Sequence, residues 1–295
     1  MTGISVRGLT KHYGRVTAVD DLAFEVPAGA VTGFLGPNGA GKTTTLRMLL
    51  GLVQPSAGEA LIDGRRYAQL ERPRAEVGAV LEATGFHPGR RGRDHLRILA
   101  YAAGLPERRV GEVLERVDLA QAADRRVGGY SLGMRQRLGL AAALLGDPGV
   151  LVLDEPANGL DPAGMAALRD LLRALAAEGR TILISSHVLS EVAQTVDRVV
   201  IASAGRLRFA GSLAELGAAA VTVRTPQAAD LAALLEARGG EVDVTGESSL
   251  EVRGLDSAEI GRLAAEKGIA LSSLGEGGSA LEAAFLKLTA GPEKA

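Results

Sequence analysis

One glycine-rich segment, Gly36–Thr43, restricts what this chain can fold into more than any other feature. It fits the pattern G-x-x-x-x-G-K-[ST], which has physical meaning only between a strand and a helix. The apolar run Val31–Leu35 before it predicts a buried strand, and Thr44–Leu50 after it predicts the first turns of a helix. Backbone N–H groups in such a turn and the dipole of the following helix both favour an anion. The segment therefore predicts a phosphate-binding loop.

Two side chains of this loop have distinct expected roles. Lys42 is expected to reach the β- and γ-phosphates of a nucleoside triphosphate, and the Thr43 hydroxyl to bind Mg²⁺. The alternative is a glycine-rich turn that fits by chance in a chain with 39 glycines, but the flanking strand and helix favour the nucleotide site. The residues expected to line it are Gly36, Pro37, Asn38, Gly39, Ala40, Gly41, Lys42, Thr43 and Thr44.

Composition limits the class of protein. At 295 residues the chain can hold a large domain, or a large and a small one, and hydrophobic residues at 46% can build a core. Aromatic residues make up only 3%, so this core must be aliphatic. The net charge of -2 gives no overall attraction to nucleic acid, and no nucleic-acid partner is expected. The absence of cysteine excludes disulfides, thiolate metal sites and cysteine nucleophiles.

No segment has the pattern of a signal peptide or a membrane span. The first residues lack an apolar stretch, and the longest apolar run, near Leu138–Gly146, is shorter than the roughly twenty residues that a bilayer requires. We expect a cytoplasmic chain whose membrane part, if any, is supplied by another subunit.

Alternating strand and helix patterns predict a parallel α/β sheet with right-handed crossovers in residues 1–217. A helical insertion at about residues 90–146 and the helix Ala163–Ala177 separate its later strands, and Arg198–Ala210 is predicted to be a closing hairpin. The predicted strands are Ile4–Leu9, Ala18–Val26, Val31–Leu35, Gly58–Ile62, Val77–Leu81, Val150–Leu153 and Thr181–Ser185.

Residues 218–295 predict a second, smaller α+β domain with the βαββαβ order of a ferredoxin-like unit. A final helix, Ala280–Leu288, follows it. The expected elements are strand Val221–Thr225, helix Gln227–Arg238, strands Glu241–Thr245 and Leu250–Arg253, helix Ser257–Lys267 and strand Ile269–Leu274.

Polar residues follow two aliphatic strands of the larger domain. Asp154 and Glu155 end the run Val150–Leu153, at the sheet edge where open α/β sheets bind ligands. Asp154 is expected to hold Mg²⁺, and Glu155 to polarise the water that attacks the γ-phosphate. His187 ends another aliphatic strand and is expected to hydrogen-bond the γ-phosphate, although a lone histidine there is often structural. The alternative for the acids is a strand end with two solvated carboxylates.

A fourth segment, Tyr130–Arg137, precedes a strongly apolar helix. Ser131 and Gly133 at the helix start suggest a second anion site, but Ser131 as a plain N-cap is the better interpretation of this segment alone.

Taken in order, these segments closely resemble the ATP-binding subunit of an ATP-binding cassette (ABC) transporter, over roughly Ile4–Gly211. Gly36–Thr43 matches the Walker A loop, Leu151–Glu155 the Walker B strand with its catalytic glutamate, Ser131–Met134 the family signature and Asn158–Asp161 the D-loop. A P-loop kinase or GTPase would lack the signature and the D-loop in this order. The resemblance implies a P-loop NTPase fold, an ATPase activity, and ATP and Mg²⁺ as cofactors.

The resemblance also implies roles for single residues. Tyr13 matches the aromatic residue that stacks on adenine, and His187 matches the switch histidine. Ser131, Gly133 and Asp161 are implied to contact ATP, Lys42, Glu155 and His187 to act in catalysis, and Thr43, Asp154 and Glu82 to hold the metal.

The chain departs from the family pattern at two positions. Glu82 stands where the family usually has glutamine, and it would add a negative charge near the phosphates. Leu132 stands where the signature has glycine, so close backbone approach is less free there. Both departures resemble the branch of bacitracin-export and lantibiotic-resistance ATPases, which implies export of an antibiotic, peptide or drug-like compound.

In this family each ATP lies between the Walker A loop of one cassette and the signature of another. The resemblance therefore implies a homodimer with two composite sites, bound to membrane permease subunits at the cytoplasmic face of a bacterial-type membrane. The basic segment Phe86–Arg93 is implied to meet the permease, with a plain solvated loop as the alternative. A soluble ABC ATPase with a non-transport role remains the alternative function. The second domain is either a dimerisation or regulatory module or a packing appendage.

Overall fold

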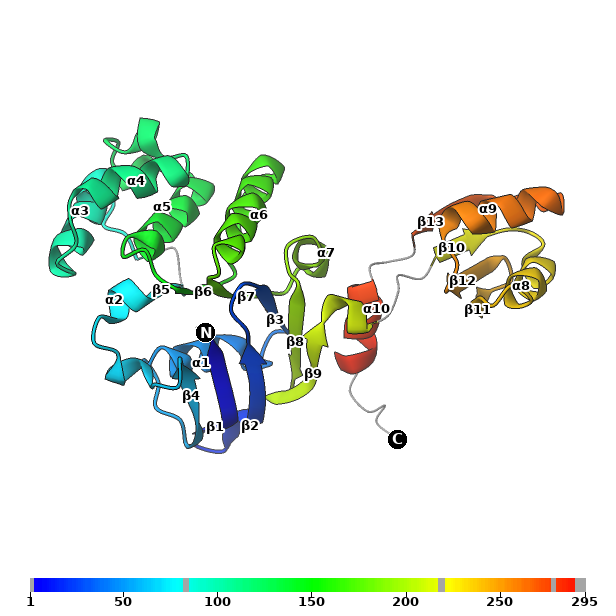
Figure 1. The fold of residues 1–295 in the computed structure, drawn as a ribbon, viewed down its shortest axis with the longest axis horizontal. Coiled ribbons are helices and arrows are strands. Elements are labelled where there is room, and N and C mark those ends of the chain that lie inside the picture. The colour runs from blue at the N-terminus through cyan, green and yellow to red at the C-terminus, as the bar shows by residue number, and fades with distance from the viewer. Residues whose placement is uncertain (1–2, 82–84, 217–220, 277–279, 290–295) are drawn as a thin grey trace. The chain divides into compact units, whose positions relative to one another are not determined.

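The computed structural model describes residues 3–81, 85–216, 221–276 and 280–289 (Figure 1). The chain divides into two compact units, Met1–Gly211 and Ser212–Ala295. The boundary expected between residues 217 and 218 lies outside the described residues. None of the helices in the described ranges has the length and apolar character needed to cross a membrane.

A six-stranded sheet forms the centre of the first unit, in the order β5-β6-β7-β3-β8-β9. Pairing from β5 through β8 is parallel, as the alternating pattern predicted. Every residue of β3, β6 and β7 is buried, because helices or strands cover both faces of a parallel sheet. The strands are β3 (Val31–Leu35), β5 (Val77–Val80), β6 (Val150–Asp154), β7 (Thr181–Ser186), β8 (Arg198–Ser203) and β9 (Arg206–Ser212).

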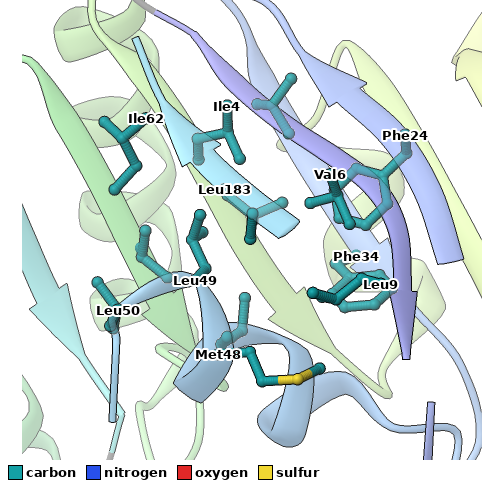
Figure 2. Packing of buried hydrophobic residues seen from close by; sticks show 14 of the residues in the cluster. Ile4, Val6, Leu9, Phe24, Phe34, Met48, Leu49, Leu50, Ile62 and Leu183 are labelled. Atoms are coloured by element: carbon teal, nitrogen blue, oxygen red, sulfur yellow. The ribbon is translucent and has the colours of Figure 1, made fainter. Parts of the chain in front are cut away.

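A three-stranded antiparallel sheet of β2 (Val16–Val26), β1 (Ile4–Tyr13) and β4 (Ala57–Ile62) packs against the central sheet. Helix α1 (Lys42–Leu49) contributes to the same hydrophobic core. Figure 2 shows side chains from the small sheet, from α1 and from the central strands filling one hydrophobic core, which includes Phe24 and Phe34. This packing fixes the position of α1, and therefore that of the loop before it.

Helices α3 (Gly92–Ala102), α4 (Arg108–Arg116) and α5 (Leu132–Leu144) contact one another and form the helical insertion between β5 and β6 (Figure 1). The predicted insertion is present. Helix α6 (Pro162–Ala177) contacts β3 and β7. The short helices are α2 (Pro73–Glu76), α7 (Leu189–Ala193) and the 3-10 turns Tyr67–Gln69, Ala120–Ala122, Val127–Gly129 and Leu213–Leu216.

The second unit has the predicted βαββαβ order, and its four strands pair antiparallel in the order β11-β12-β10-β13. Helices and strands bury an aliphatic core of their own, separate from that of the first unit. The elements are β10 (Val221–Arg224), α8 (Ala228–Glu236), β11 (Glu241–Gly246), β12 (Ser249–Arg253), α9 (Ser257–Glu266), β13 (Ser273–Glu276) and the final helix α10 (Ala280–Thr289).

The last strand of this unit differs from the prediction. It spans Ser273–Glu276 rather than Ile269–Leu274. Ile269 instead completes the end of α9: its N–H donates to the Ala264 carbonyl at 2.9 Å, and Gly268 before it has φ 66°. This hydrogen-bond pattern is that of a Schellman motif, in which an apolar residue just after the glycine packs against the last helical turns. The buried side chain of Ile269 therefore reflects helix termination and not strand formation.

Candidate active site

The predicted site residues meet because three adjacent parallel strands end at one edge of the central sheet. Strand β7 lies between β3 and β6, with Leu35 in register with Ser186 and Asp154 in register with Ser185. Parallel strands of similar length place their carboxyl ends together, and this edge is the ligand side of an open α/β sheet. The glycine-rich loop, the acidic pair and the histidine therefore share one end of the sheet.

The loop between β3 and α1 needs glycine at defined positions. Gly41, the N-cap of α1, has φ 91°, and Gly39 has φ 82°. A Cβ at Gly41 would lie 2.5 Å from the Ala18 carbonyl oxygen, and one at Gly36 would lie 2.4 Å from that of Ala202. The backbone there is packed too closely for any side chain, which leaves the amide groups as the lining of the loop.

Lys42 is buried at the first position of α1. Its Nζ donates to the Gly36 carbonyl at 2.6 Å and to the Pro37 carbonyl at 3.4 Å. Burial lowers the pKa of the Lys42 ammonium group, and the carboxylates of Glu155 and Asp154 partly oppose that shift. Among the described residues, only carbonyl oxygens contact the ammonium group. A phosphate oxygen would supply an anionic partner that these residues do not place within contact distance.

The two carboxylate oxygens of Asp154 connect β6 to helix α1 and to strand β7. Oδ2 accepts the Thr43 hydroxyl at 2.8 Å, and Oδ1 accepts the Ser185 hydroxyl. Asp154 is buried, and both of its side-chain partners are hydroxyl groups. Thr43 and Asp154, each predicted to bind Mg²⁺, are therefore hydrogen-bonded to each other.

Glu155 and His187 face each other across two strand ends. Glu155 Oε2 lies 2.8 Å from His187 Nδ1, and the two side chains are 23% and 49% exposed. Glu155 has φ 50°, an unusual backbone conformation for a residue with a side chain, and one that is enriched at functional sites. The acid and the imidazole are therefore held together at the solvent-facing side of the sheet edge.

A cavity of about 380 Å³ collects most of these groups. Loop residues line one side of it, and Glu155, Asn158 and His187 line the other. Asn158 is absent from the predicted contact residues, although it belongs to the D-loop motif. Its position follows from a tight turn, in which its N–H donates to the Glu155 carbonyl at 3.2 Å. The lining residues are Asn38, Gly39, Ala40, Gly41, Lys42, Thr43, Thr44, Glu155, Asn158 and His187.

Six predicted contact residues do not line this cavity, among them Gly36 and Pro37 at the start of the loop. Ser131 and Asp161 act as N-caps, accepting hydrogen bonds from the backbone N–H groups of Met134 at 3.2 Å and Gly164 at 2.8 Å. Gly133 lies in the first turn of α5. Tyr13 ends β1 and is 49% exposed, with Lys11 Nζ 5.0 Å from its ring centre. Glu82, the remaining predicted metal ligand, lies outside the described residues.

The first turn of α5 packs on the D-loop of the same chain. Gln136 Nε2 donates to the Asn158 carbonyl at 3.1 Å, and Leu132, 49% exposed, covers Gly159, which has φ 76°. A Cβ on Gly159 would lie 2.1 Å from Leu132 Cδ2. The leucine that departs from the family signature therefore occupies the space above the D-loop glycine.

This contact predicts the effect of adding one methyl group. Gly159→Ala is expected to lower the free energy of unfolding by at least ~2 kcal/mol, because left-handed strain and overlap with Leu132 add together. Gly179→Ala is the matched control, since Gly179 has φ 89° and a Cβ added there would meet nothing within 4 Å. Denaturant unfolding of both variants separates the two contributions. Equal losses in the two variants would show that Leu132 does not press on Gly159.

Comparison with known sequences agrees with this geometry. A family model described as ABC transporter matches residues 19–158. The chain is 46% identical over 209 residues to the bacitracin transport ATP-binding protein BcrA of Bacillus licheniformis, covering 70% of this chain and 68% of that protein. It is 37% identical over 194 residues to the lantibiotic transport ATP-binding protein SrtF of Streptococcus pyogenes, covering 66% and 84%. A family model described as a domain of unknown function (DUF8746) matches residues 219–282.

Solved structures give the same result. The ATP-binding subunit of an ABC transporter has a TM-score of 0.66 and 30% identity, over 72% of this chain and 91% of that one. A dimeric bacterial ABC transporter cassette, MJ0796, has a TM-score of 0.64 at 22% identity, over 71% and 98%, and shares the fold.

The fold and the strand-end site define a P-loop ATPase. The chain belongs to the ABC transporter family, as one of its ATP-hydrolysing, ATP-binding subunits. The predicted similarity to bacitracin and lantibiotic transport ATPases is confirmed.

Proposed function

We propose that this chain powers the export of an antibiotic, peptide or drug-like compound through a separate membrane permease, using ATP bound in the cavity beside Lys42. The observation that carries the site is the convergence of three strand ends on one cavity, with the buried Lys42, the Thr43–Asp154 pair and the Glu155–His187 pair. The substrate class rests on the relatives named for bacitracin and lantibiotic transport.

The residues at the strand ends fit Mg²⁺. Thr43 Oγ1 and Asp154 Oδ2 are 2.8 Å apart, and both are hard oxygen ligands of the type that Mg²⁺ prefers. Among the described residues, no three His, Cys, Asp or Glu side chains gather to hold a metal alone. That suits an ion which takes one or two protein ligands and completes its shell with phosphate oxygens and water. When bound, Mg²⁺ would neutralise part of the phosphate charge.

The side chains of the cavity then have separate roles. The loop amides and Lys42 would bind and orient the β- and γ-phosphates. Glu155 would accept a hydrogen bond from the attacking water, and His187, 2.8 Å from Glu155, would hold that carboxylate and contact the γ-phosphate. Positioning and electrostatic stabilisation would supply most of the rate enhancement.

The arrangement of the signature supports a dimer with shared sites. Ser131 and Gly133 lie outside the cavity that the chain's own loop lines. Ser131 and Leu132 are exposed at the start of α5, so this surface is free to face the ATP of a second copy. A C₂ homodimer would complete two equivalent sites in this way. Tyr13 would stack on adenine from the exposed end of β1.

The basic segment Phe86–Arg93, exposed in part and leading into α3, is the proposed contact with the permease at the cytoplasmic face of the membrane. We propose a dimerisation or regulatory role for the second unit, with a packing appendage as the alternative. A soluble ATPase with a non-transport role is the alternative for the whole chain.

Co-purification tests the transport function. Isolated from detergent-solubilised membranes with an affinity tag, the chain is expected to bring down a polytopic membrane protein in a stoichiometric complex. Recovery with ribosomes or DNA and without any membrane protein would overturn the proposal. A variant with Arg90, Arg91 and Arg93 replaced by alanine tests the contact surface, since it should lose the membrane partner and keep ATP binding.

A further inference from the structure

Ser185 contacts both acidic residues of the site, although it does not line the nucleotide cavity. It lies on β7, completely buried, in register with Asp154 of β6. Its hydroxyl donates to Asp154 Oδ1 and accepts the backbone N–H of Glu155 at 3.0 Å. The Ser185 carbonyl accepts the same N–H at 3.2 Å. One serine therefore links the carboxylate of one acid to the backbone of the next.

The first of these hydrogen bonds orients the Asp154 carboxylate. With Oδ1 occupied by the Ser185 hydroxyl, Oδ2 is the oxygen that faces Thr43 and the loop. A carboxylate held from behind by a buried hydroxyl cannot rotate freely about its terminal torsion. The oxygen on the nucleotide side is thus fixed before any ligand arrives, which is how partners of ligating groups tune metal sites.

The second hydrogen bond holds a strained backbone. Glu155 has φ 50°, a conformation that costs roughly 1–2 kcal/mol for a residue with a Cβ. The Glu155 N–H is held by both the hydroxyl and the carbonyl oxygen of Ser185. With the backbone in this conformation, the Glu155 side chain contacts His187. Without the hydroxyl, the N–H keeps one partner and the bend is less firmly set.

We propose that Ser185 is a positioning residue for ATP hydrolysis, which aims Asp154 Oδ2 at the metal and fixes the backbone that presents Glu155. This inference rests on the proposed roles of those two acids. The neighbouring serine has a different task, because the Ser186 hydroxyl accepts the Val188 N–H at 3.0 Å in the turn after the strand. Ser185, and not Ser186, therefore has the proposed positioning role.

The test compares Ser185→Ala with Ser185→Thr. Ser185→Ala is expected to lower kcat by about 10–100-fold. It is also expected to raise the Mg²⁺ concentration needed for half-maximal ATP binding by about tenfold. Both effects lie in the range typical for the loss of a hydrogen-bond partner of a metal ligand. ATP binding measured without Mg²⁺ should stay at the wild-type level. Ser185→Thr keeps the hydroxyl and should restore both values; Ser185 is among the residues around a cavity of about 410 Å³.

Mg²⁺-dependent binding is measured by fluorescence of a trinitrophenyl-ATP probe in a Glu155→Gln background, where the probe is not consumed. Thr32→Val is the matched control, because no described residue forms a hydrogen bond with this buried hydroxyl on β3, and its loss should leave both readouts unchanged. If Ser185→Ala does not fold, Ser185→Cys is used in its place. Its thiol has nearly the same size as the hydroxyl but is a weak donor, so the same increase in the Mg²⁺ requirement is expected.

A wild-type Mg²⁺ requirement and a wild-type kcat in Ser185→Ala, or in Ser185→Cys where that variant decides, would overturn the role of Ser185. A failure of the proposed roles of Asp154 and Glu155 is a different result, since wild-type protein itself would then show no Mg²⁺-dependent ATP binding. A failure of the proposed export function would appear only in the co-purification experiment.

Discussion

Glu155→Gln protein is expected to bind ATP with wild-type affinity and to lose hydrolysis by about 10²–10⁴-fold, the range expected when a general base is removed. The amide keeps the size of the side chain and can still contact His187 Nδ1, which lies 2.8 Å from Oε2 in the wild type. It cannot accept a proton from water. Phosphate release under single-turnover conditions measures the chemical step, and nucleotide fluorescence measures binding.

This variant also reports on assembly. Because ATP would persist, the proposed dimer should accumulate with ATP and dissociate when ATP is removed, which size-exclusion chromatography with light scattering detects. Glu25→Gln makes the same charge change at an exposed position of β2 and serves as the control. Hydrolysis at the wild-type rate in Glu155→Gln would exclude Glu155 as the base.

Lys42→Met is expected to reduce ATP affinity by at least about 10²-fold, because a charge-assisted hydrogen bond and most of the positive charge at the phosphates are lost together. Without nucleotide, the same substitution is not expected to lower the free energy of unfolding. Burial lowers the pKa of Lys42 below 10.5, so the charged lysine reduces stability at neutral pH. That cost decreases as pH rises from the folded-state pKa toward 10.5, since the unfolded chain then binds more protons.

Thermal unfolding with and without ATP tests both effects. At an ATP concentration 100 times Kd, the free energy of unfolding of wild-type protein should increase by about 2.7 kcal/mol. The free energy of unfolding of Lys42→Met should not increase at that concentration. Without nucleotide, Lys42→Met should be at least as stable as wild type at pH 7. Lys267→Ala, an exposed lysine of the second unit, controls for the loss of charge. ATP-dependent stabilisation of normal size in Lys42→Met would place the nucleotide elsewhere.

The central sheet was predictable because its strands are buried on both faces. Val150–Leu153 and Thr181–Ile184 are nearly continuous aliphatic runs, and Val31–Leu35 has apolar residues at both ends, a pattern typical of strands buried on both faces. The polar residues that follow each run were therefore expected at one edge of the sheet. The error at Ile269–Leu274 has a similar origin: an apolar residue after a helix was assigned to a strand, although it closes a Schellman motif.

The contacts between side chains were less predictable. Ser185 was predicted only as part of a strand, and nothing in its neighbours indicates that its hydroxyl bridges two acids. Asn158 enters the cavity through the turn after Glu155, and Leu132 covers Gly159, because loops of distant segments meet there. Ser131 and Asp161, expected at the nucleotide, are N-caps within this chain and lie outside the cavity that the loop lines.

The order of motifs along the chain was enough to identify the phosphate loop, the acidic strand end and the histidine, since residue type and the period of hydrophobicity are local properties. Only the tertiary structure decided which strands lie side by side. It therefore also decided that His187 contacts Glu155 and that Lys42 is buried. In the same way, it decided that Thr43 and Ser185 both donate to the carboxylate of Asp154. The physical reason is that these contacts join residues 31 to 111 positions apart, and only the packing of the sheet sets their distances and orientations.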